Sequence, residues 1–240
     1  MAVVLAMTVL GGCAGRPVQK NDVPEVAEIN LKLGVGYMQS GHYAVALEKL
    51  QKALEYDEDM AIAHNAIAVL YEETGEDALA EQHFRRALEL DSGLNVARMN
   101  FGRFLCARRR PAEGEALFRA VLDDQKAAET AYIGAGVCAR QGGDPVQAET
   151  YLRQALEINP ESPGALFELA GLSYDQDKAL QARAFLQRYH AEAGYSPASL
   201  WMGIGIEEKL GDLEIRRHYA TLLLSKFAGS REARRLLGSE

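Results

Sequence analysis

This sequence has few of the features that mark nucleic-acid-binding proteins or β-sheet proteins. No segment alternates apolar and polar residues for long enough to predict a β-strand. The net charge is −8, and a chain this acidic lacks the basic face that phosphate binding requires. The basic run Arg108–Arg110 precedes Pro111 and is expected to be a solvated turn. These absences argue against a β fold and against nucleic acid as a partner.

Catalytic and metal-binding patterns are also missing. No glycine-rich phosphate loop follows a strand, and no nucleophile–base arrangement can be recognised. The histidines do not show metal-ligand spacing on one helix; they are His42, His64, His83, His190 and His218. The sequence therefore predicts that this protein is not an enzyme and has no catalytic residue, metal site or cofactor.

What the sequence does contain is a pattern that repeats every 34 residues. Small residues recur at this spacing, namely Ala46, Ala80, Gly114, Ala148 and Ala182. Large apolar residues follow the same spacing, namely Leu50, Phe84, Phe118, Leu152 and Leu186. A third series keeps the register with Ala53, Ala87, Val121, Ala155 and Tyr189. Helices that cross closely need small side chains at the crossing point, so the pattern predicts stacked helix pairs.

The period and the placement of small and large residues resemble the tetratricopeptide repeat, a helix–turn–helix unit that stacks into a solenoid. We therefore predict an all-α fold in residues 27–240. Its six repeats are expected at residues 27–60, 61–94, 95–128, 129–162, 163–196 and 197–230. The sixth is degenerate, because Arg216 stands where alanine is expected. Such a solenoid presents an extended concave surface that typically holds other proteins.

The chain after the sixth repeat predicts a short capping helix. Ser230 is a suitable N-cap for a helix from Arg231 to Leu237. This capping segment, residues 231–238, would cover the end of the solenoid, with its arginines outward and with Leu236 and Leu237 inward. The single tryptophan, Trp201, is expected to belong to the core of the sixth repeat.

The N-terminal residues resemble a bacterial lipoprotein signal. Residues 1–12 carry no charge and are too few to span a bilayer, which takes about 20 residues, but they suit the apolar part of a signal peptide. The tetrad from Leu10 to Cys13 resembles a lipobox, which implies cleavage before Cys13 and attachment of diacylglyceryl to its sulfur. No Lys or Arg precedes Cys13, so we expect the true start to lie upstream of Met1.

A lipid on Cys13 would anchor the mature chain in a membrane. The next residue is Ala14, whereas Asp at that position usually retains a lipoprotein in the inner membrane. The expected location is therefore the periplasmic face of the outer membrane. Residues 13–26 would form the lipidated terminus and a flexible tether. The alternative is a soluble protein with an apolar N-terminus.

The two remaining cysteines, Cys106 and Cys138, belong to the first helices of consecutive repeats. Neighbouring first helices lie side by side, so the sulfurs could meet and form a disulfide in the oxidising periplasm. Such a bond would close a loop of about 32 residues and contribute about 3–4 kcal/mol. The alternative is that both are small buried apolar residues.

Several segments resemble a family of lipoproteins for type IV pilus biogenesis and stability, of the PilW/PilF type. The stretch from Asn100 to Cys106 reads Asn-Phe-Gly-Arg-Phe-Leu-Cys, close to the family's third repeat. Further similar segments are Ala63–Ala66, Gln82–Leu88, Gly136–Cys138, Ser199–Gly203 and Lys226–Ala233. The last of these departs from the family, because Ala228 replaces a proline. The resemblance covers nearly the whole chain, lipobox included.

This resemblance implies a pilotin, an outer-membrane lipoprotein that binds the secretin subunit of the pilus machine. It implies that the protein promotes the outer-membrane localisation of the secretin and its assembly into multimers. The lipid would follow the lipoprotein sorting pathway while the concave surface holds a secretin segment, which raises the local concentration of secretin at the membrane. The expected partners are thus the secretin and the membrane, and the protein on its own is expected to be a monomer.

The concave surface of such a solenoid is built from positions 2, 5, 6, 9, 12 and 13 of each first helix. In the first three repeats these positions form an unusually apolar stripe, and an exposed stripe of this kind usually marks a partner site. The predicted groove residues are Leu31, Val35, Met38, Ile62, Asn65, Val69, Val96, Met99 and Asn100. The two asparagines would hydrogen-bond the backbone of an extended peptide, or else cap and solvate helices. Alternatively, the tether or tight curvature fills the stripe.

Two other functions remain open. A periplasmic lipoprotein with the same fold could serve outer-membrane barrel assembly or peptidoglycan enzymes, and would differ only in its partner. A cytoplasmic adaptor would require residues 1–12 to have no targeting role. Palmitate labelling that depends on Cys13 separates the cytoplasmic adaptor from both lipoproteins.

Overall fold

The computed structural model describes residues 23–238, and every regular element in that range is an α-helix. The first four helices are α1 (Val23–Gln39), α2 (Tyr43–Tyr56), α3 (Ala61–Thr74) and α4 (Asp77–Leu90). The next four are α5 (Asn95–Ala107), α6 (Pro111–Arg119), α7 (Ala128–Gln141) and α8 (Pro145–Ile158). The last are α9 (Pro163–Asp175), α10 (Ala179–Ala193), α11 (Pro197–Leu210), α12 (Leu213–Lys226) and α13 (Arg231–Leu236). The predicted all-α repeat fold is confirmed.

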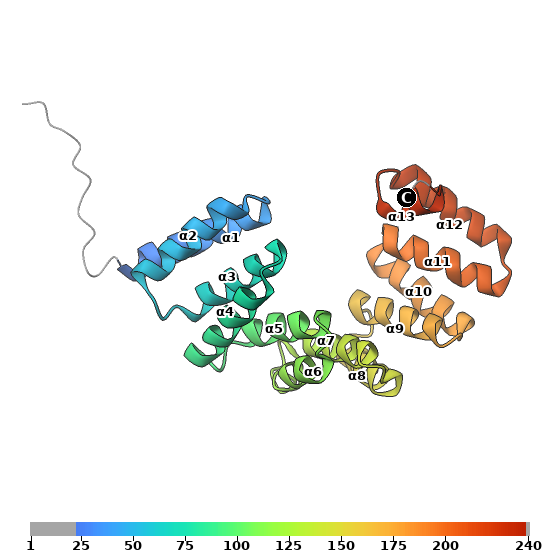
Figure 1. Ribbon diagram of the computed structural model, residues 1–240. Coiled ribbons are helices and arrows are strands. Elements are labelled where there is room, and N and C mark those ends of the chain that lie inside the picture. Colours follow the sequence, from blue (N-terminus) through green and yellow to red (C-terminus); the bar gives the residue numbers. More distant parts are fainter. Residues whose placement is uncertain (1–22, 239–240) are drawn as a thin grey trace, which may run out of the picture. The chain divides into compact units, whose positions relative to one another are not determined.

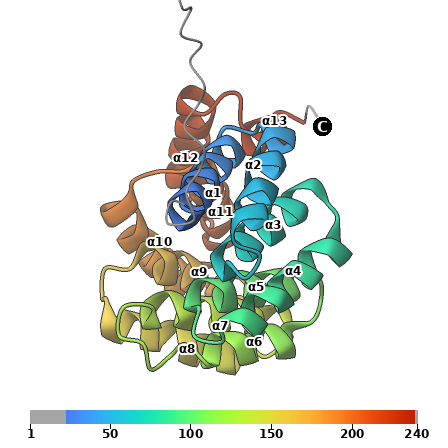
Figure 2. The same ribbon diagram turned by 90° about the vertical axis from the view of Figure 1, so that its left-hand side faces the viewer.

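The chain forms two compact units. The first ends at Leu90 and contains α1–α4, and the second begins at Asp91 and contains α5–α13. In each unit consecutive helices pack as antiparallel hairpins, such as α1 with α2 and α11 with α12 (Figure 1). The same hairpins can be followed from the side in Figure 2. No helix among residues 23–238 is long and apolar enough to cross a membrane.

The 34-residue register appears in the burial of the second helix of each hairpin. The residues at the three repeating offsets are fully buried in α2 and in α8; they are Ala46, Leu50, Ala53, Ala148, Leu152 and Ala155. Gly34 of α1 shows how closely the helices cross, because a Cβ there would lie 2.6 Å from the Leu50 side chain. Small side chains at these offsets therefore allow each hairpin to close.

Local signals place the starts of many helices. Five helices have a proline in the first turn; these are Pro24, Pro111, Pro145, Pro163 and Pro197. Five N-cap side chains accept a hydrogen bond from the backbone N–H three residues on; these are Asp144, Ser162, Ser196, Asp212 and Ser230. Each such cap satisfies a backbone donor that the helix itself leaves unpaired. The predicted N-cap role of Ser230 is confirmed.

The turn inside each hairpin contains one residue with a left-handed backbone. Residues with positive φ recur every 34 positions, at Gly41, Gly75, Arg109, Gly143, Asp177 and Gly211. Glycine adopts this conformation at little cost, whereas a residue with a side chain loses about 1–2 kcal/mol. The third and fifth repeats therefore carry backbone strain that the other four repeats lack.

Replacing Arg109 with glycine should stabilise the protein. Arg109 is exposed and has φ of 59°, so Arg109→Gly relieves the strain and removes no buried contact. The gain should be about 0.5–1 kcal/mol, because glycine also adds entropy to the unfolded chain. The urea midpoint measures it. As a control, Gly143→Ala places a methyl group in open space at φ +82° and should lower the midpoint. A lower midpoint for Arg109→Gly would show that this turn is not strained.

Helix α1 begins earlier than the predicted repeat boundary. The tether was expected to extend to Val26, but residues from Val23 are helical. Pro24 and Glu25 in the first turn favour a helix start there, and Ala27 is already fully buried. The predicted signal peptide and the remainder of the tether lie outside the described residues.

The second helix of the third repeat is shorter than its register implies. Helix α6 ends at Arg119, so Val121 lies beyond it, although its side chain is buried. The following residues form turns in which several N–H groups bond the carbonyl three residues back; these belong to Val121, Leu122, Asp124 and Ala127. The Asp124 carboxylate holds this loop by accepting from the Asn95 amide at 2.7 Å and from the Lys126 backbone N–H at 2.9 Å. The side chain of Val121 nevertheless packs in the core.

The C-terminal hairpin and its cap differ from expectation in one residue. The sixth repeat forms a complete hairpin, although Arg216 replaces the usual alanine. Leu237 was expected to face inward, but α13 ends before it and its side chain is 64% exposed. Ala233 is instead the fully buried residue of this helix. Trp201 packs against the same apolar cluster and is half-buried.

A histidine is enclosed by tyrosines in the last two repeats. The His190 ring centroid lies 4.6 Å from that of Tyr195 and 5.6 Å from that of Tyr219. Its Nε2 atom is buried and has no hydrogen-bond partner. Burial among apolar ring atoms disfavours the charged imidazolium and lowers the pKa of His190 from 6.5 to about 4.

This histidine should make the protein less stable in mild acid. Below pH 6.5 the unfolded chain takes up a proton at His190 that the folded chain does not bind until about pH 4. Stability is therefore full above pH 6.5 and falls as the pH drops toward 4, by about 2 kcal/mol after allowance for partial exposure. His190→Phe keeps a ring but takes up no proton, so its stability should fall less over this range in denaturant titrations. Parallel losses in the two proteins would contradict this account.

Candidate functional site

An apolar pocket of about 380 Å³ lies between the first helices of the third and fourth repeats, in the second unit. The α5–α7 pocket is lined by Met99, Asn100, Arg103, Cys106, Ala107, Phe118, Thr130, Ile133, Gly134, Val137, Cys138 and Gln141. Most of its wall is aliphatic, aromatic or sulfur, with a few polar groups from Asn100, Arg103, Thr130 and Gln141. An apolar hollow with a few polar groups is the usual form of a binding site.

The α7 side of the pocket was missed by the prediction, which followed the groove positions through the first three repeats. The same positions in the fourth repeat are Thr130, Ile133, Gly134, Val137, Arg140 and Gln141. All of these except Arg140 line the pocket. Extending the register by one repeat would therefore have found this wall from the sequence. Of the predicted groove residues, Met99 and Asn100 are brought into the pocket.

Glycines make room for the aromatic ring at the base of the pocket. A Cβ on Gly134 would collide with the Phe118 ring, and one on Gly102 would lie 2.9 Å from it. Phe118 is itself buried and belongs to the core of the second unit. The pocket thus has a rigid aromatic base that a larger residue at position 134 would displace.

The two cysteines of the second unit form a disulfide that borders the pocket. Cys106 of α5 and Cys138 of α7 are bonded, with their Cα atoms 5.4 Å apart, and both side chains are buried. A Cβ on Gly114 would collide with the Cys106 sulfur. This explains why the small residue of the third repeat is glycine where four other repeats have alanine. The disulfide ties together the two helices that carry opposite walls.

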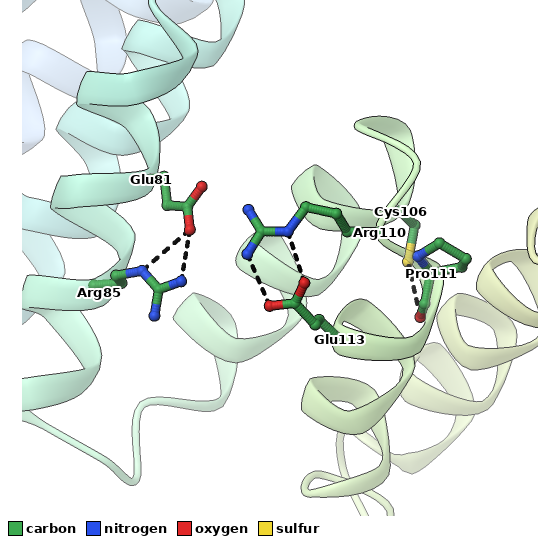
Figure 3. A network of polar contacts seen from close by, with 6 residues as sticks. All are labelled: Glu81, Arg85, Cys106, Arg110, Pro111 and Glu113. Carbon is green, nitrogen blue, oxygen red and sulfur yellow. Dashed lines mark hydrogen bonds and ion pairs between the residues drawn. The ribbon is translucent and has the colours of Figure 1, made fainter.

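The turn between α5 and α6, which follows Cys106, is held by an ion pair. The Arg110 guanidinium donates to both carboxylate oxygens of Glu113 at 2.7 Å, and the Cys106 sulfur lies 4.0 Å from the Pro111 carbonyl oxygen (Figure 3). Arg108 lies over the Phe104 ring at 4.9 Å. The basic run Arg108–Arg110 thus supports the α5–α6 turn by local contacts.

In the first unit, the predicted groove residues are largely engaged in packing. Leu31, Val35 and Met38 of α1 are half-buried against a core cluster that includes Leu50 and Ile67. They present only part of their surface, because the stripe also supports the hairpin core. The two remaining apolar groove residues of α3, Ile62 and Val69, are half-buried as well.

The predicted groove residues Asn65 and Val96 differ in their exposure. Asn65 is only 6% exposed, which favours the alternative, a role in capping the helices, over a contact with a peptide backbone. Val96 is exposed at the start of α5 but does not line the pocket.

The structure also pairs two histidines that are far apart in sequence. His64 of α3 and His83 of α4 approach with their Nδ1 atoms 3.0 Å apart, and His64 Nε2 lies 3.3 Å from the Glu58 carbonyl oxygen. Burial lowers the pKa of both rings, which favours the neutral forms that one N–H···N hydrogen bond requires. No group of three or more potential metal ligands occurs within residues 23–238. The pair is a structural hydrogen bond between the helices of one hairpin.

The predicted lipidation residue, Cys13, lies outside the described residues, so its surroundings are not part of the structure. Its assignment depends on the sequence pattern Leu10–Cys13 alone.

Comparison with known proteins identifies the repeat and its relatives. A tetratricopeptide-repeat model matches residues 31–95 and 101–163, and a second such model matches residues 139–198. The type IV pilus assembly protein PilF of Pseudomonas aeruginosa is 30% identical over 210 residues, which are 87% of this chain and 83% of PilF.

Two solved structures share both the fold and detectable sequence similarity. The structure of PilF from Pseudomonas aeruginosa aligns with a TM-score of 0.74 and 28% identity, over 91% of this chain and 99% of that one. PilW, described as a widely conserved type IV pilus biogenesis factor, aligns with a TM-score of 0.79 and 28% identity, over 89% of this chain and 99% of that one. The similarity therefore extends over nearly the whole repeat domain.

Proposed function

This chain belongs to the family of tetratricopeptide-repeat proteins for type IV pilus biogenesis that includes PilF and PilW, and we propose that it is a pilotin. In this role it is an outer-membrane lipoprotein that binds the secretin subunit of the pilus machine. It promotes the localisation of the secretin in the outer membrane and its assembly into multimers. The repeat fold and the relatives point to a non-catalytic adaptor.

The α5–α7 pocket is the observation that carries this proposal. Its wall is apolar, it opens on the groove positions of two consecutive repeats, and the disulfide holds its two sides at a fixed separation. A preformed apolar pocket favours binding because little conformational entropy is lost when the partner docks. Polar groups from Thr130 and Gln141 at the wall offer hydrogen-bonding sites to a peptide backbone.

The lipid anchor is the second part of the proposal and is supported by the sequence. The lipobox-like tetrad places Cys13 ten residues before the start of α1. A fully extended segment of that length spans at most about 35 Å. Lipidated Cys13 would therefore keep the repeat domain close to the membrane surface. A bound secretin subunit would be carried with it, and its local concentration at the membrane would rise.

Deletion of the gene tests the proposal. In the deletion strain we expect heat-stable multimers of the co-encoded pilus secretin to disappear from the outer membrane while the monomer persists. Complementation with the wild-type gene should restore them. Complementation with Cys13→Ser should restore binding to the secretin but not its outer-membrane location, because only the anchor is lost.

Two results would contradict the proposal. Unchanged multimers in the deletion strain would exclude the pilotin role and leave a pilus-family adaptor with another partner. Full restoration by Cys13→Ser, together with the absence of Cys13-dependent palmitate labelling, would exclude the lipid anchor while leaving secretin binding intact.

A further inference from the structure

An apolar ridge on the outer face of α1 has no counterpart on the other first helices. Ile29, Leu33 and Tyr37 follow one another at four-residue spacing and are 48%, 45% and 38% exposed. Residues spaced by four lie along one face of a helix. A separate face of α1 carries Ala27 and Gly34, which are buried in the first hairpin. Helix α1 therefore has two apolar faces, and only one of them is covered.

The repeat register shows what this face does elsewhere in the chain. Ile29 occupies position 3 of its repeat, and the residues at position 3 of α3, α7, α9 and α11 are all fully buried: Ala63, Ala131, Ala165 and Ser199. Leu33 occupies position 7, and the residues there are also buried: Ile67, Ala135, Leu169 and Gly203. In these helices the face packs against the preceding hairpin of the same unit. The ridge on α1 is thus half of a helix-packing interface.

Helix α2, which covers the same face of α3 inside the first unit, shows which side chains pack well against it. Ile67 of α3, at the position of Leu33, packs in a cluster with Leu47, Leu50 and Leu54 of α2. These leucines are spaced i, i+3 and i+7, so they form one side of an amphipathic helix. The matching occupant of the ridge is therefore a helix with aliphatic residues at that spacing.

The residue at position 3 further restricts which helix can pack on the ridge. Position 3 carries alanine or serine in the covered helices but isoleucine in α1. Helix α2 runs antiparallel to α3, so the end of α2 that carries Leu54 lies beside the start of α3. A helix on the ridge must therefore present a small residue opposite Ile29 to reach the same packing distance.

We propose that the ridge Ile29–Leu33–Tyr37 docks an amphipathic α-helix of a partner protein, packed as the second helix of a preceding repeat would be. A head-to-tail copy of this chain is a poorer occupant, because α13 covers the last hairpin and buries Ala233 against it. A lipid surface is disfavoured by the acidic residues Glu25 and Glu28 on the same helix. The inference does not depend on secretin binding to the α5–α7 pocket.

A helix-stabilised, fluorescently labelled peptide with the sequence of α2, residues 43–56, tests the proposal. It carries Leu54→Ala to make room for Ile29. We expect saturable binding to the full-length protein in fluorescence anisotropy. Leu33→Glu should weaken binding at least about tenfold, since it places a charge in an apolar contact. The matched control Leu180→Glu changes an exposed leucine of α10 and should leave binding unchanged. A peptide that also carries Leu50→Glu should not bind.

Four outcomes would overturn the proposal. One is the absence of binding at peptide concentrations up to about 1 mM. Another is equal loss of binding in Leu33→Glu and Leu180→Glu when circular dichroism shows both to be folded. A third is a dimer of the full-length protein that Leu33→Glu dissociates, which would make a second copy the occupant. The last is binding only after proteolytic removal of residues 1–22, which would make the chain's own N-terminal segment the occupant.

Discussion

Loss of the Cys106–Cys138 disulfide should lower the free energy of unfolding of the second unit by about 3–4 kcal/mol. The bond joins residues separated by 32 positions, and removing it releases a long loop in the unfolded chain. In the folded state both sulfurs are buried, so the double variant Cys106→Ala/Cys138→Ala also leaves a small cavity. The measurement is urea unfolding of the oxidised wild type, the reduced wild type and the double variant.

Comparison of these three proteins separates the stability that the covalent bond contributes from the stability that packing of the two sulfurs contributes. The reduced wild type keeps both sulfurs in place and should lose most of the stability, and the double variant should lose somewhat more. An unchanged midpoint on reduction would show that the bond does not stabilise the fold. A loss in the double variant alone would assign the whole effect to the cavity.

A charge in the α5–α7 pocket should abolish the adaptor function without unfolding the protein. Val137 lines the pocket on α7 and is half-buried, so Val137→Glu brings a carboxylate into the contact surface at little cost to the core. A docked apolar partner would have to bury that charge, which costs several kcal/mol and weakens binding more than about tenfold. The readout is the amount of heat-stable secretin multimers in cells, together with binding of the purified protein to the secretin.

Val146→Glu is the matched control for this variant. It makes the same substitution in the same repeat, at an exposed valine in the first turn of α8 that does not line the pocket. We expect it to support wild-type levels of multimers. If Val137→Glu also supports them while folded, the pocket is not the contact surface, and the apolar stripe on α1 becomes the next candidate.

The sequence predicted more of the fold than of the site. The period of 34 residues located the helix pairs, because small residues are required wherever two helices cross. The register also fixes the left-handed turn positions, including the strained ones at Arg109 and Asp177. Boundaries were less certain, as the early start of α1 and the early end of α6 show. Both depend on a few local hydrogen bonds and caps that the periodic pattern does not contain.

The groove residues show that the repeat register does not determine which positions are exposed. Position 5 is Asn65 in the second repeat and Ile133 in the fourth, yet the first is buried and the second lines a pocket. The histidine pair His64–His83 likewise joins two helices through residues with no motif between them. Exposure at such positions depends on how neighbouring helices pack.

By itself, the sequence determined the repeat, its register, the all-α class and the family of this protein, since each depends on residue types at fixed spacings. The tertiary structure alone decided which apolar positions pack against a neighbour and which stay open. It placed the pocket beside the disulfide and left the ridge Ile29–Leu33–Tyr37 exposed. The physical reason is that every repeat has the same local pattern, while the surface it exposes depends on the helices packed before and after it.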